Sequence, residues 1–120
     1  MLPRAHRLTK RGDYVRVRHH GRSRAHPLLI LVVAPNGGET TRVGIVVGKK
    51  VGTAVVRNRV KRLLREAART RVSCLPPGYD IVLIARQEAA GARLGDIAVA
   101  LDVLLQRERL LSGRNRSGGP

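Results

Sequence analysis

The sequence is poor in aromatic residues and in cysteine. It contains no Phe and no Trp, and Tyr14 and Tyr79 are its only Phe, Trp or Tyr residues. Any surface that stacks nucleic-acid bases would therefore have few aromatic platforms. The single cysteine, Cys74, excludes an internal disulfide framework and a cysteine-based zinc finger, and it is typical of a reducing compartment.

Long apolar runs and acidic residues are also scarce. The longest apolar run, residues 28–34, is too short to span a bilayer, and no apolar stretch follows the basic N-terminus. We therefore expect neither a membrane span nor a secretory signal. The chain has 8 acidic residues, and none falls in a D-x-D or H-x-E arrangement. We expect no metal ligands and no catalytic carboxylate pair in this chain.

Basic residues, in contrast, are abundant and concentrated. Lys and Arg number 24, which gives a formal net charge of +16 at pH 7. Residues 1–26 hold eight basic residues and one acidic residue, residues 42–71 hold ten and one, and the rest of the chain is close to neutral. Such a charge opposes compaction, so we expect a polyanionic partner, nucleic acid first and an anionic membrane surface second.

The length of 120 residues and the hydrophobic content of 42% are those of one small domain. We expect this domain to span residues 1–111, followed by a flexible tail at residues 112–120. Periodicity and turn residues predict three helices and three strands. In chain order they are a helix from Lys10 to His20 capped by Thr9, strands over 28–33 and 41–47, a helix from Ala54 to Arg71 capped by Thr53, a strand from Tyr79 to Ala85, and a helix from Asp96, its cap, to Leu111.

This order predicts an α+β fold, a two-layer α/β sandwich in which helices pack on one small sheet. We expect the first two strands to form a hairpin or a meander, since a Pro-Asn-Gly-Gly turn follows the first of them. In the first helix we expect Tyr14, Val15 and Val17 to face inward. In the last helix, Ile97, Leu101, Leu104 and Leu105 share one face.

The central helix separates its residues sharply by type. At 100° per residue, its valines, leucines and alanines fall in one arc, and a group of cations with Asn58 falls on the opposite side. Cations spaced four residues apart repel each other, and Glu66 is the only acidic residue near them. A merely solvated face usually alternates Glu with Lys, so this pattern favours phosphate binding.

A 19-residue run, GKKVGTAVVRNRVKRLLRE at residues 48–66, closely resembles the signature of the bacterial ribonuclease P protein subunit. Its pattern is a strand, a KK-x-G-x-A loop and RNR-x-KR-x-x-R on a helix. Further residues match the family in order: Arg7-Leu8, Asp13-Tyr14, Gly21, Arg42-Val43-Gly44, residues 78–82 and Arg86.

The resemblance implies a fold of three helices on a four-stranded, mostly antiparallel sheet. It also implies that the basic helix connects two parallel strands by a left-handed crossover, which sequence patterns alone would not predict. The order becomes α-β-β-(β)-α-β-α. Either one of our three strands is split, or a short strand near Val15–Arg18 or Val72–Leu75 remains to be added.

The resemblance further implies the function. The family pairs with a catalytic RNA, and the complex removes the 5′ leader of precursor tRNA by endonucleolytic cleavage. Chemistry and Mg²⁺ are then expected to belong mainly to the RNA subunit. Ribonuclease P RNA and precursor tRNA are the implied partners, with no membrane and no small-molecule substrate, and the cytoplasm is the implied location.

Site residues follow from matching positions together with the basic helix face. The implied RNA contacts are Lys49, Lys50, Arg57, Asn58, Arg59, Lys61, Arg62, Arg65 and Arg69. The implied groove for the single-stranded leader, between the first helix and the sheet, comprises Tyr14, Arg18, Ile30, Val32 and Ala54. We interpret Asp13 and Asp80 as structural.

The groove departs from the family in its aromatic content. Arg18 stands where relatives often carry a second aromatic, and aliphatic residues near Ile30 and Val32 replace another. Since stacking contributes about 1–3 kcal/mol per base, we expect leader binding to depend more on charge, and therefore more steeply on salt, than in aromatic-rich relatives. A ribosomal or RNA-assembly protein remains the alternative, and the KK-x-G-x-A-x-x-RNR run argues against it.

Overall fold

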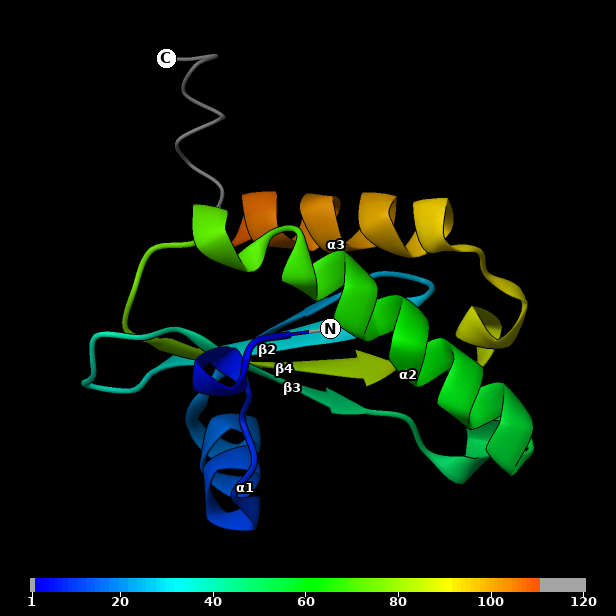
Figure 1. Cartoon of the computed structure of the whole chain (residues 1–120), viewed down its shortest axis with the longest axis horizontal. Helices are drawn as coiled ribbons and strands as arrows, with labels where there is room; N and C mark the ends of the chain where they lie inside the picture. Colours follow the sequence, from blue (N-terminus) through cyan, green and yellow to red (C-terminus); the bar gives the residue numbers. More distant parts are fainter. Residues whose placement is uncertain (1, 111–120) are drawn as a thin grey trace.

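The computed structural model describes residues 2–110 (Figure 1). The helices are α1 (Arg11–His20), α2 (Ala54–Arg69) and α3 (Leu94–Arg107), and the strands are β1 (Arg22–Ala25), β2 (Leu29–Pro35), β3 (Arg42–Val46) and β4 (Tyr79–Ala85). Short 3-10 turns η1 to η4 span Arg4–His6, Lys49–Val51, Val72–Cys74 and Gln87–Gly91. The α+β class is confirmed.

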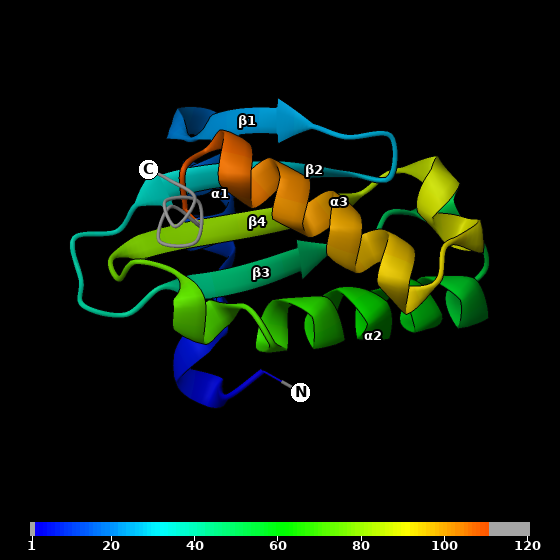
Figure 2. The ribbon, with the colours of Figure 1, turned by 90° about the horizontal axis from the view of Figure 1, so that it is seen from above.

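The four strands form one sheet in the order β1-β2-β4-β3. β1 pairs with β2, and β2 with β4, in antiparallel fashion, whereas β3 and β4 are parallel. In Figure 2 the two parallel strands run left to right, α2 lies on the viewer's side, and β4 lies above β3. The crossover from β3 through α2 to β4 is therefore left-handed, as the family resemblance implies.

Two expectations about the strands are wrong. β2 and β3 do not form a hairpin or a simple meander, because β4 lies between them and pairs with both. The fourth strand is β1, which lies at neither of the two positions expected for it, since Val72–Cys74 is a 3-10 turn and residues 15–18 belong to α1. β1 reads Arg-Ser-Arg-Ala, which has no apolar alternation, and pairing with β2 defines it.

The main core lies between the sheet and the layer formed by α2 and α3 (Figure 1). α2 buries Val60, Leu64, Ala67 and Ala68, and its residues Val56 and Leu63 are partly buried against the same core. The predicted inner face of α3 is also confirmed, since all four of its residues are buried. The apolar arcs predicted from the sequence thus orient both helices correctly.

A second, smaller core lies on the opposite face of the sheet, beneath α1. Val17 is the only residue of α1 that is fully buried, Tyr14 is half-buried, and Val15 is exposed, contrary to expectation. In Figure 1, α1 packs under the half of the sheet at which β3 and β4 begin. The other half of this face is therefore left without a helix.

Helix ends differ in part from those predicted. Thr53 caps α2, its hydroxyl accepting a hydrogen bond from the Val56 amide at 3.4 Å. Thr9 does not cap α1, which begins after Lys10. Asp96 is not the N-cap of α3 but its third residue, where its carboxylate accepts from the Arg93 amide at 3.0 Å. The predicted tail, residues 112–120, lies outside the described residues.

Candidate nucleic-acid interface

The sheet face that carries α1 is organised in three rows, each crossing β2, β4 and β3. The pairing registers place these side chains side by side: Ala34, Asp80 and Arg42 in the first row, Val32, Val82 and Gly44 in the second, and Ile30, Ile84 and Val46 in the third. Alternation along the strands puts all nine on one face. α1 covers the second row, and the first is polar. Only the third row is apolar and accessible.

This third row forms the floor of an open hollow. Ile30, Val46 and Ile84 are each partly exposed and line the hollow together with Arg18 of α1. The rest of its lining comes from the segments that follow β3 and β4, chiefly Gly48, Lys49, Lys50, Arg86, Gln87 and Glu88. An aliphatic floor with a cationic rim can receive the bases of a nucleic-acid strand against the floor and its phosphates against the rim.

A second hollow lies where β3 meets α1 and the N-terminal segment. Tyr14, Gly44 and Ile45 line it together with Arg65 of α2 and the N-terminal segment around Arg7. The Tyr14 hydroxyl donates to the Leu8 carbonyl at 2.9 Å, and burial raises the pKa of this hydroxyl. A Cβ at Gly44 would lie 2.5 Å from the tyrosine ring, so a glycine is needed for Tyr14 to lie this close to β3.

The structure separates the five residues predicted for the leader groove. Arg18 and Ile30 line the first hollow, and Tyr14 lines the second. Val32 is only 5% exposed beneath α1, so it is not available to a ligand. Ala54 is exposed at the start of α2, close in sequence to the lysines of the rim, but it does not line the hollow.

Sequence reasoning did not single out Val46 and Ile84, which line the open hollow. Both have the alternating, β-branched pattern of strands, but only the pairing of β2 with β4 and of β4 with β3 aligns them with Ile30. A correct strand order would have been the signal that found them. Gln87 and Glu88, which carry no positive charge, were missed as well and add hydrogen-bonding groups to the rim.

The nine residues predicted to contact RNA divide into two groups. Three arginines are held by the protein itself: Arg57 donates to the Gly52 carbonyl at 3.2 Å, Arg59 to the carbonyls of Ala90 and Ala92, and Arg69 to Glu66 at 3.0 Å. The side chains of the other six form no hydrogen bond or ion pair with any residue from 2 to 110; they are Lys49, Lys50, Asn58, Lys61, Arg62 and Arg65.

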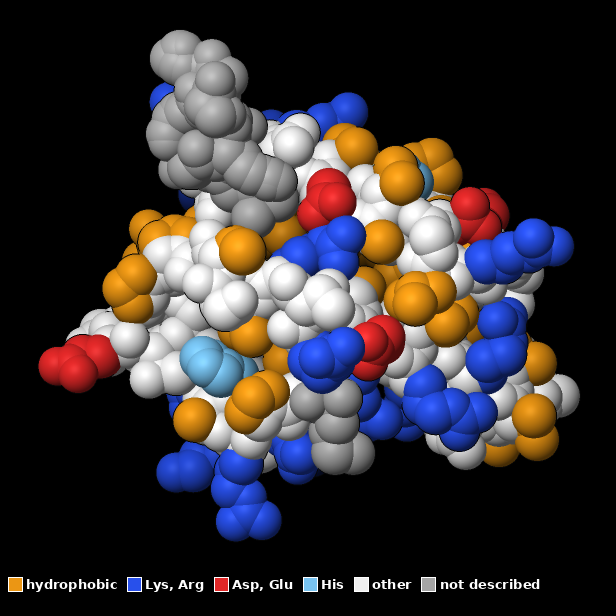
Figure 3. All heavy atoms as spheres, turned by 45° about the horizontal axis from the view of Figure 1, so that its top comes forward, with side chains coloured by type: hydrophobic (Ala, Val, Ile, Leu, Met, Phe, Trp, Pro, Cys, Tyr) orange, Lys and Arg blue, Asp and Glu red, His pale blue; other side chains and the backbone are white. Residues whose placement is uncertain are grey.

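The unpaired cations lie on two adjoining elements, η2 and α2. Lys49, Lys50, Arg62 and Arg65 are exposed, and Lys61 is half-buried. Figure 3, which views the side of the molecule that carries α2 and α3, shows Lys and Arg side chains gathered towards the lower right, with few acidic side chains among them. Unpaired cations repel one another, so binding of a polyanion relieves repulsion as well as adding contacts.

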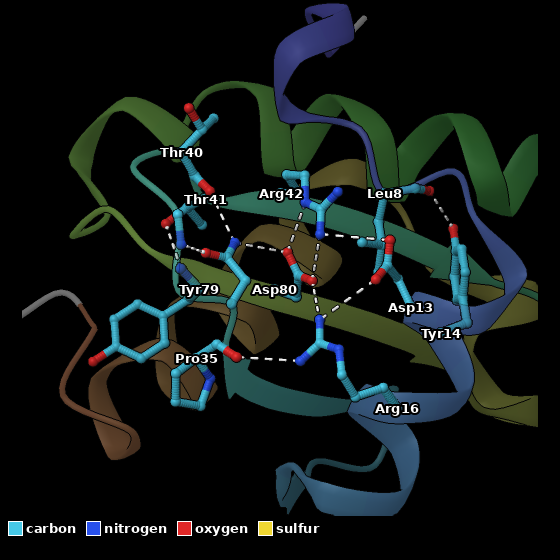
Figure 4. Close-up of polar contacts among 12 residues, drawn as sticks. Leu8, Asp13, Tyr14, Arg16, Pro35, Thr40, Thr41, Arg42, Tyr79 and Asp80 are labelled. Carbon is cyan, nitrogen blue, oxygen red and sulfur yellow. Dashed lines mark hydrogen bonds and ion pairs between the residues drawn. The ribbon is translucent and has the colours of Figure 1, made fainter.

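A buried carboxylate fixes α1 to the sheet at the polar row. Asp80 has no exposed surface, and its two oxygens accept from Arg42 at 2.9 and 2.8 Å, from Asn36 at 2.9 Å and from Arg16 of α1 (Figure 4). Burial alone would raise the pKa of Asp80, but the hydrogen bonds and the two arginine charges outweigh it and lower this pKa below its ordinary value. Asp80 is thus a structural anion, as predicted.

Within residues 2–110, no three His, Cys, Asp or Glu side chains are grouped so that they could hold a metal ion. No helix in that range has the length and apolar character needed to cross a membrane.

Comparisons with known proteins agree on one family. The family model described as Ribonuclease P matches residues 2–109. A ribonuclease P protein component of Dehalococcoides mccartyi is 44% identical over 92% of this chain and 91% of its own length, and one of Herpetosiphon aurantiacus is 43% identical over 96% and 94%. The solved ribonuclease P protein of Staphylococcus aureus superposes with a TM-score of 0.80 at 32% identity, covering 88% of this chain and 97% of that one.

Proposed function

Since this chain belongs to the ribonuclease P protein family and is the protein subunit of that endoribonuclease, we propose that its apolar third row receives the single-stranded 5′ leader of precursor tRNA. The open hollow lined by Ile30, Ile84 and Val46 carries this proposal. A partnership with ribonuclease P RNA follows from the family.

The arrangement of charge supports a division of tasks between two surfaces. The rim of the hollow brings Arg18, Lys49, Lys50 and Arg86 around the floor, where leader phosphates would pass. Lys61, Arg62 and Arg65 lie on α2 outside the open hollow, and their side chains have no partner within residues 2–110, so they are available to the phosphates of a folded RNA. We assign the hollow to the leader and the unpaired cations of α2 to the RNA subunit.

Residues 2–110 offer no cluster of three carboxylate, His or Cys side chains that could hold Mg²⁺ without the RNA. Asp80 is enclosed by two arginines and an asparagine, and Glu108 is paired with Arg24 at 2.5 Å. Hydrated Mg²⁺ is usually held by one or two accessible carboxylates together with phosphates. We therefore propose that Mg²⁺ and the cleavage chemistry belong to the RNA subunit, in the cytoplasm where precursor tRNA is made. The alternative of a ribosomal protein gains no support from the comparisons.

The experiment for this function is reconstitution at low Mg²⁺. The purified protein is added to a bacterial ribonuclease P RNA, and cleavage is measured on a precursor tRNA with a long leader and on one with a single-nucleotide leader. We expect the protein to restore cleavage of both and to lower the KM of the long-leader substrate more strongly. Equal stimulation of the two substrates would contradict the assignment of the leader to the hollow. No stimulation of either substrate would contradict the role of this protein in precursor-tRNA cleavage.

Replacing Arg18 by tyrosine should exchange charge for stacking in the hollow. One fewer phosphate contact lowers the slope of log affinity against log salt by about 0.7 for a single strand, and a ring on the floor adds about 1–3 kcal/mol of stacking. Arg18→Tyr is therefore expected to bind leader-bearing tRNA more tightly than the wild type at high salt, with a shallower salt dependence. Leader affinity across a salt series is the measurement.

The matched control for that variant is Arg11→Tyr, at the first residue of the same helix and outside both hollows. It makes the same chemical change and should leave the leader-dependent part of the affinity unaltered. An Arg18→Tyr variant whose salt slope equals that of the wild type would show that this arginine does not face the leader.

A further inference from the structure

α1 has little apolar packing with which to hold its position. It is ten residues long, and Val17 is its one fully buried side chain. A short helix with so small a buried face is not strongly oriented by hydrophobic contact alone. Its orientation must come largely from the polar contacts that it makes with the sheet.

Those contacts meet at Asp80. From α1, Arg16 reaches the Asp80 carboxylate and also donates to the Pro35 carbonyl at 3.2 Å (Figure 4). Asp13, one turn earlier on the same side of the helix, lies 3.5 Å from Arg42, which itself holds Asp80 through two hydrogen bonds. One carboxylate therefore joins α1 to three strands: β4 directly, β3 through Arg42, and the end of β2 through Pro35 and Asn36.

This anchor and the hollow lie on opposite sides of α1. Asp80 lies in the first row, α1 covers the second, and the floor of the hollow is the third. Arg16 extends from α1 towards the first row, whereas Arg18 extends towards the third. A rotation or shift of α1 about the second row would move Arg18 relative to Ile30 and Ile84 and would change the width of the hollow.

We propose that Asp80 is a positioning residue for leader recognition: by seating α1 through Arg16 and Arg42, it sets the width of the hollow at the far side of the helix. The inference rests on the proposed assignment of the leader to the hollow. Asp80 itself touches no RNA, since it is buried. Its effect is therefore expected in the binding of the leader and not in the binding of the RNA subunit.

The test uses the reconstituted holoenzyme with Asp80→Asn, which keeps the shape of the side chain and removes its charge. The ratio of affinities for precursor tRNA and for the same tRNA without a leader measures the leader contribution. We expect this ratio to fall about five- to tenfold, because small misplacements of binding groups are costly, while affinity for ribonuclease P RNA changes less than about twofold.

Asp102→Asn is the matched control. Asp102 is held by Arg71 at 2.6 and 3.0 Å in the α2–α3 layer, so its loss weakens the fold on the opposite side of the sheet. It should leave the leader ratio unchanged. A folded Asp80→Asn protein with the wild-type ratio, or an Asp102→Asn protein with an equal loss, would overturn the proposal. If Asp80→Asn does not fold, Arg16→Gln takes its place, since it removes only the contact between the Arg16 guanidinium of α1 and Asp80.

A second measurement follows the position of α1 relative to α2 in the protein without RNA. Spin labels on Val15→Cys and Val55→Cys, both at exposed positions, are placed in a Cys74→Ser background, and the distance between them is recorded. We expect a narrow distribution that broadens with Asp80→Asn or Arg16→Gln and stays narrow with Asp102→Asn. An unbroadened distribution would overturn the positioning role. If the wild-type holoenzyme bound precursor tRNA and leaderless tRNA equally, the assignment of the leader to the hollow would be wrong. The label distances would then still show whether Asp80 positions α1.

Discussion

Replacing Lys61, Arg62 and Arg65 together by glutamine is expected to weaken binding to ribonuclease P RNA by about 100-fold. These three side chains lie on the outer face of α2, and they form no hydrogen bond or ion pair with any residue from 2 to 110. A hydrogen bond to a charged group contributes about 1.5–3 kcal/mol, so three such contacts account for at least this loss. The slope of log affinity against log salt should fall by about three, one for each lost phosphate contact.

The stability of this triple variant should equal or slightly exceed that of the wild type, because removing unpaired like charges relieves repulsion. The matched control removes the same charge away from α2, by Arg11→Gln on α1 together with Arg107→Gln and Arg109→Gln at and just after the end of α3. It should bind the RNA within a few-fold of the wild type. Binding titrations at several salt concentrations compare the three proteins, and equal losses in both variants would show that net charge, not this surface, governs the affinity.

The second large effect is expected at Gly21, where α1 meets β1. A Cβ there would lie 2.5 Å from the Val17 carbonyl oxygen and 2.9 Å from that of Val33. Neither backbone group can move without shifting α1 or the sheet. Gly21→Ala is therefore expected to lower the free energy of unfolding by about 2–3 kcal/mol, as overpacking of a tight contact does. Urea unfolding of the purified protein measures it.

Gly12 provides the control with the opposite sign. It lies in the first turn of the same helix, and a Cβ there would meet nothing within 4 Å. Gly12→Ala should raise the free energy of unfolding by about 0.5 kcal/mol, because alanine loses less backbone freedom on folding into a helix. If both glycine variants were destabilised alike, the close approach at Gly21 would not be the cause.

The elements that the sequence predicted well are those with an internal pattern. β4 was predicted at its observed bounds, because Gly78 and Arg86 enclose a segment in which Asp80 is the only charged residue. α2 was predicted with its cap and its buried face, since Val60 and Leu64 recur at helical spacing. β1 was missed because it has no such pattern of its own, and its existence depends on the apolar strand beside it.

The site was predictable by composition but not by geometry. Nothing in the RNR-x-KR sequence distinguishes Arg59 from Arg62. Yet the Arg59 guanidinium donates hydrogen bonds to carbonyls more than 30 positions further along the chain, and the Arg62 guanidinium donates to none within residues 2–110. Likewise, Ile30 and Val32 look equivalent in the sequence, but α1 covers one and leaves the other open. Both distinctions depend on contacts between distant segments, which a local pattern does not contain.

The strand order also has a consequence for biosynthesis. β4, which lies between β2 and β3, is the last of the four strands to leave the ribosome. Until it does, the seven-residue apolar strand β2 has only the short β1 as a neighbour, and β3 has no partner strand among them. The two strand edges that β4 later covers, one on β2 and one on β3, therefore stay unpaired until β4 has left the ribosome. High positive charge on both flanking segments keeps such intermediates apart from one another during this interval.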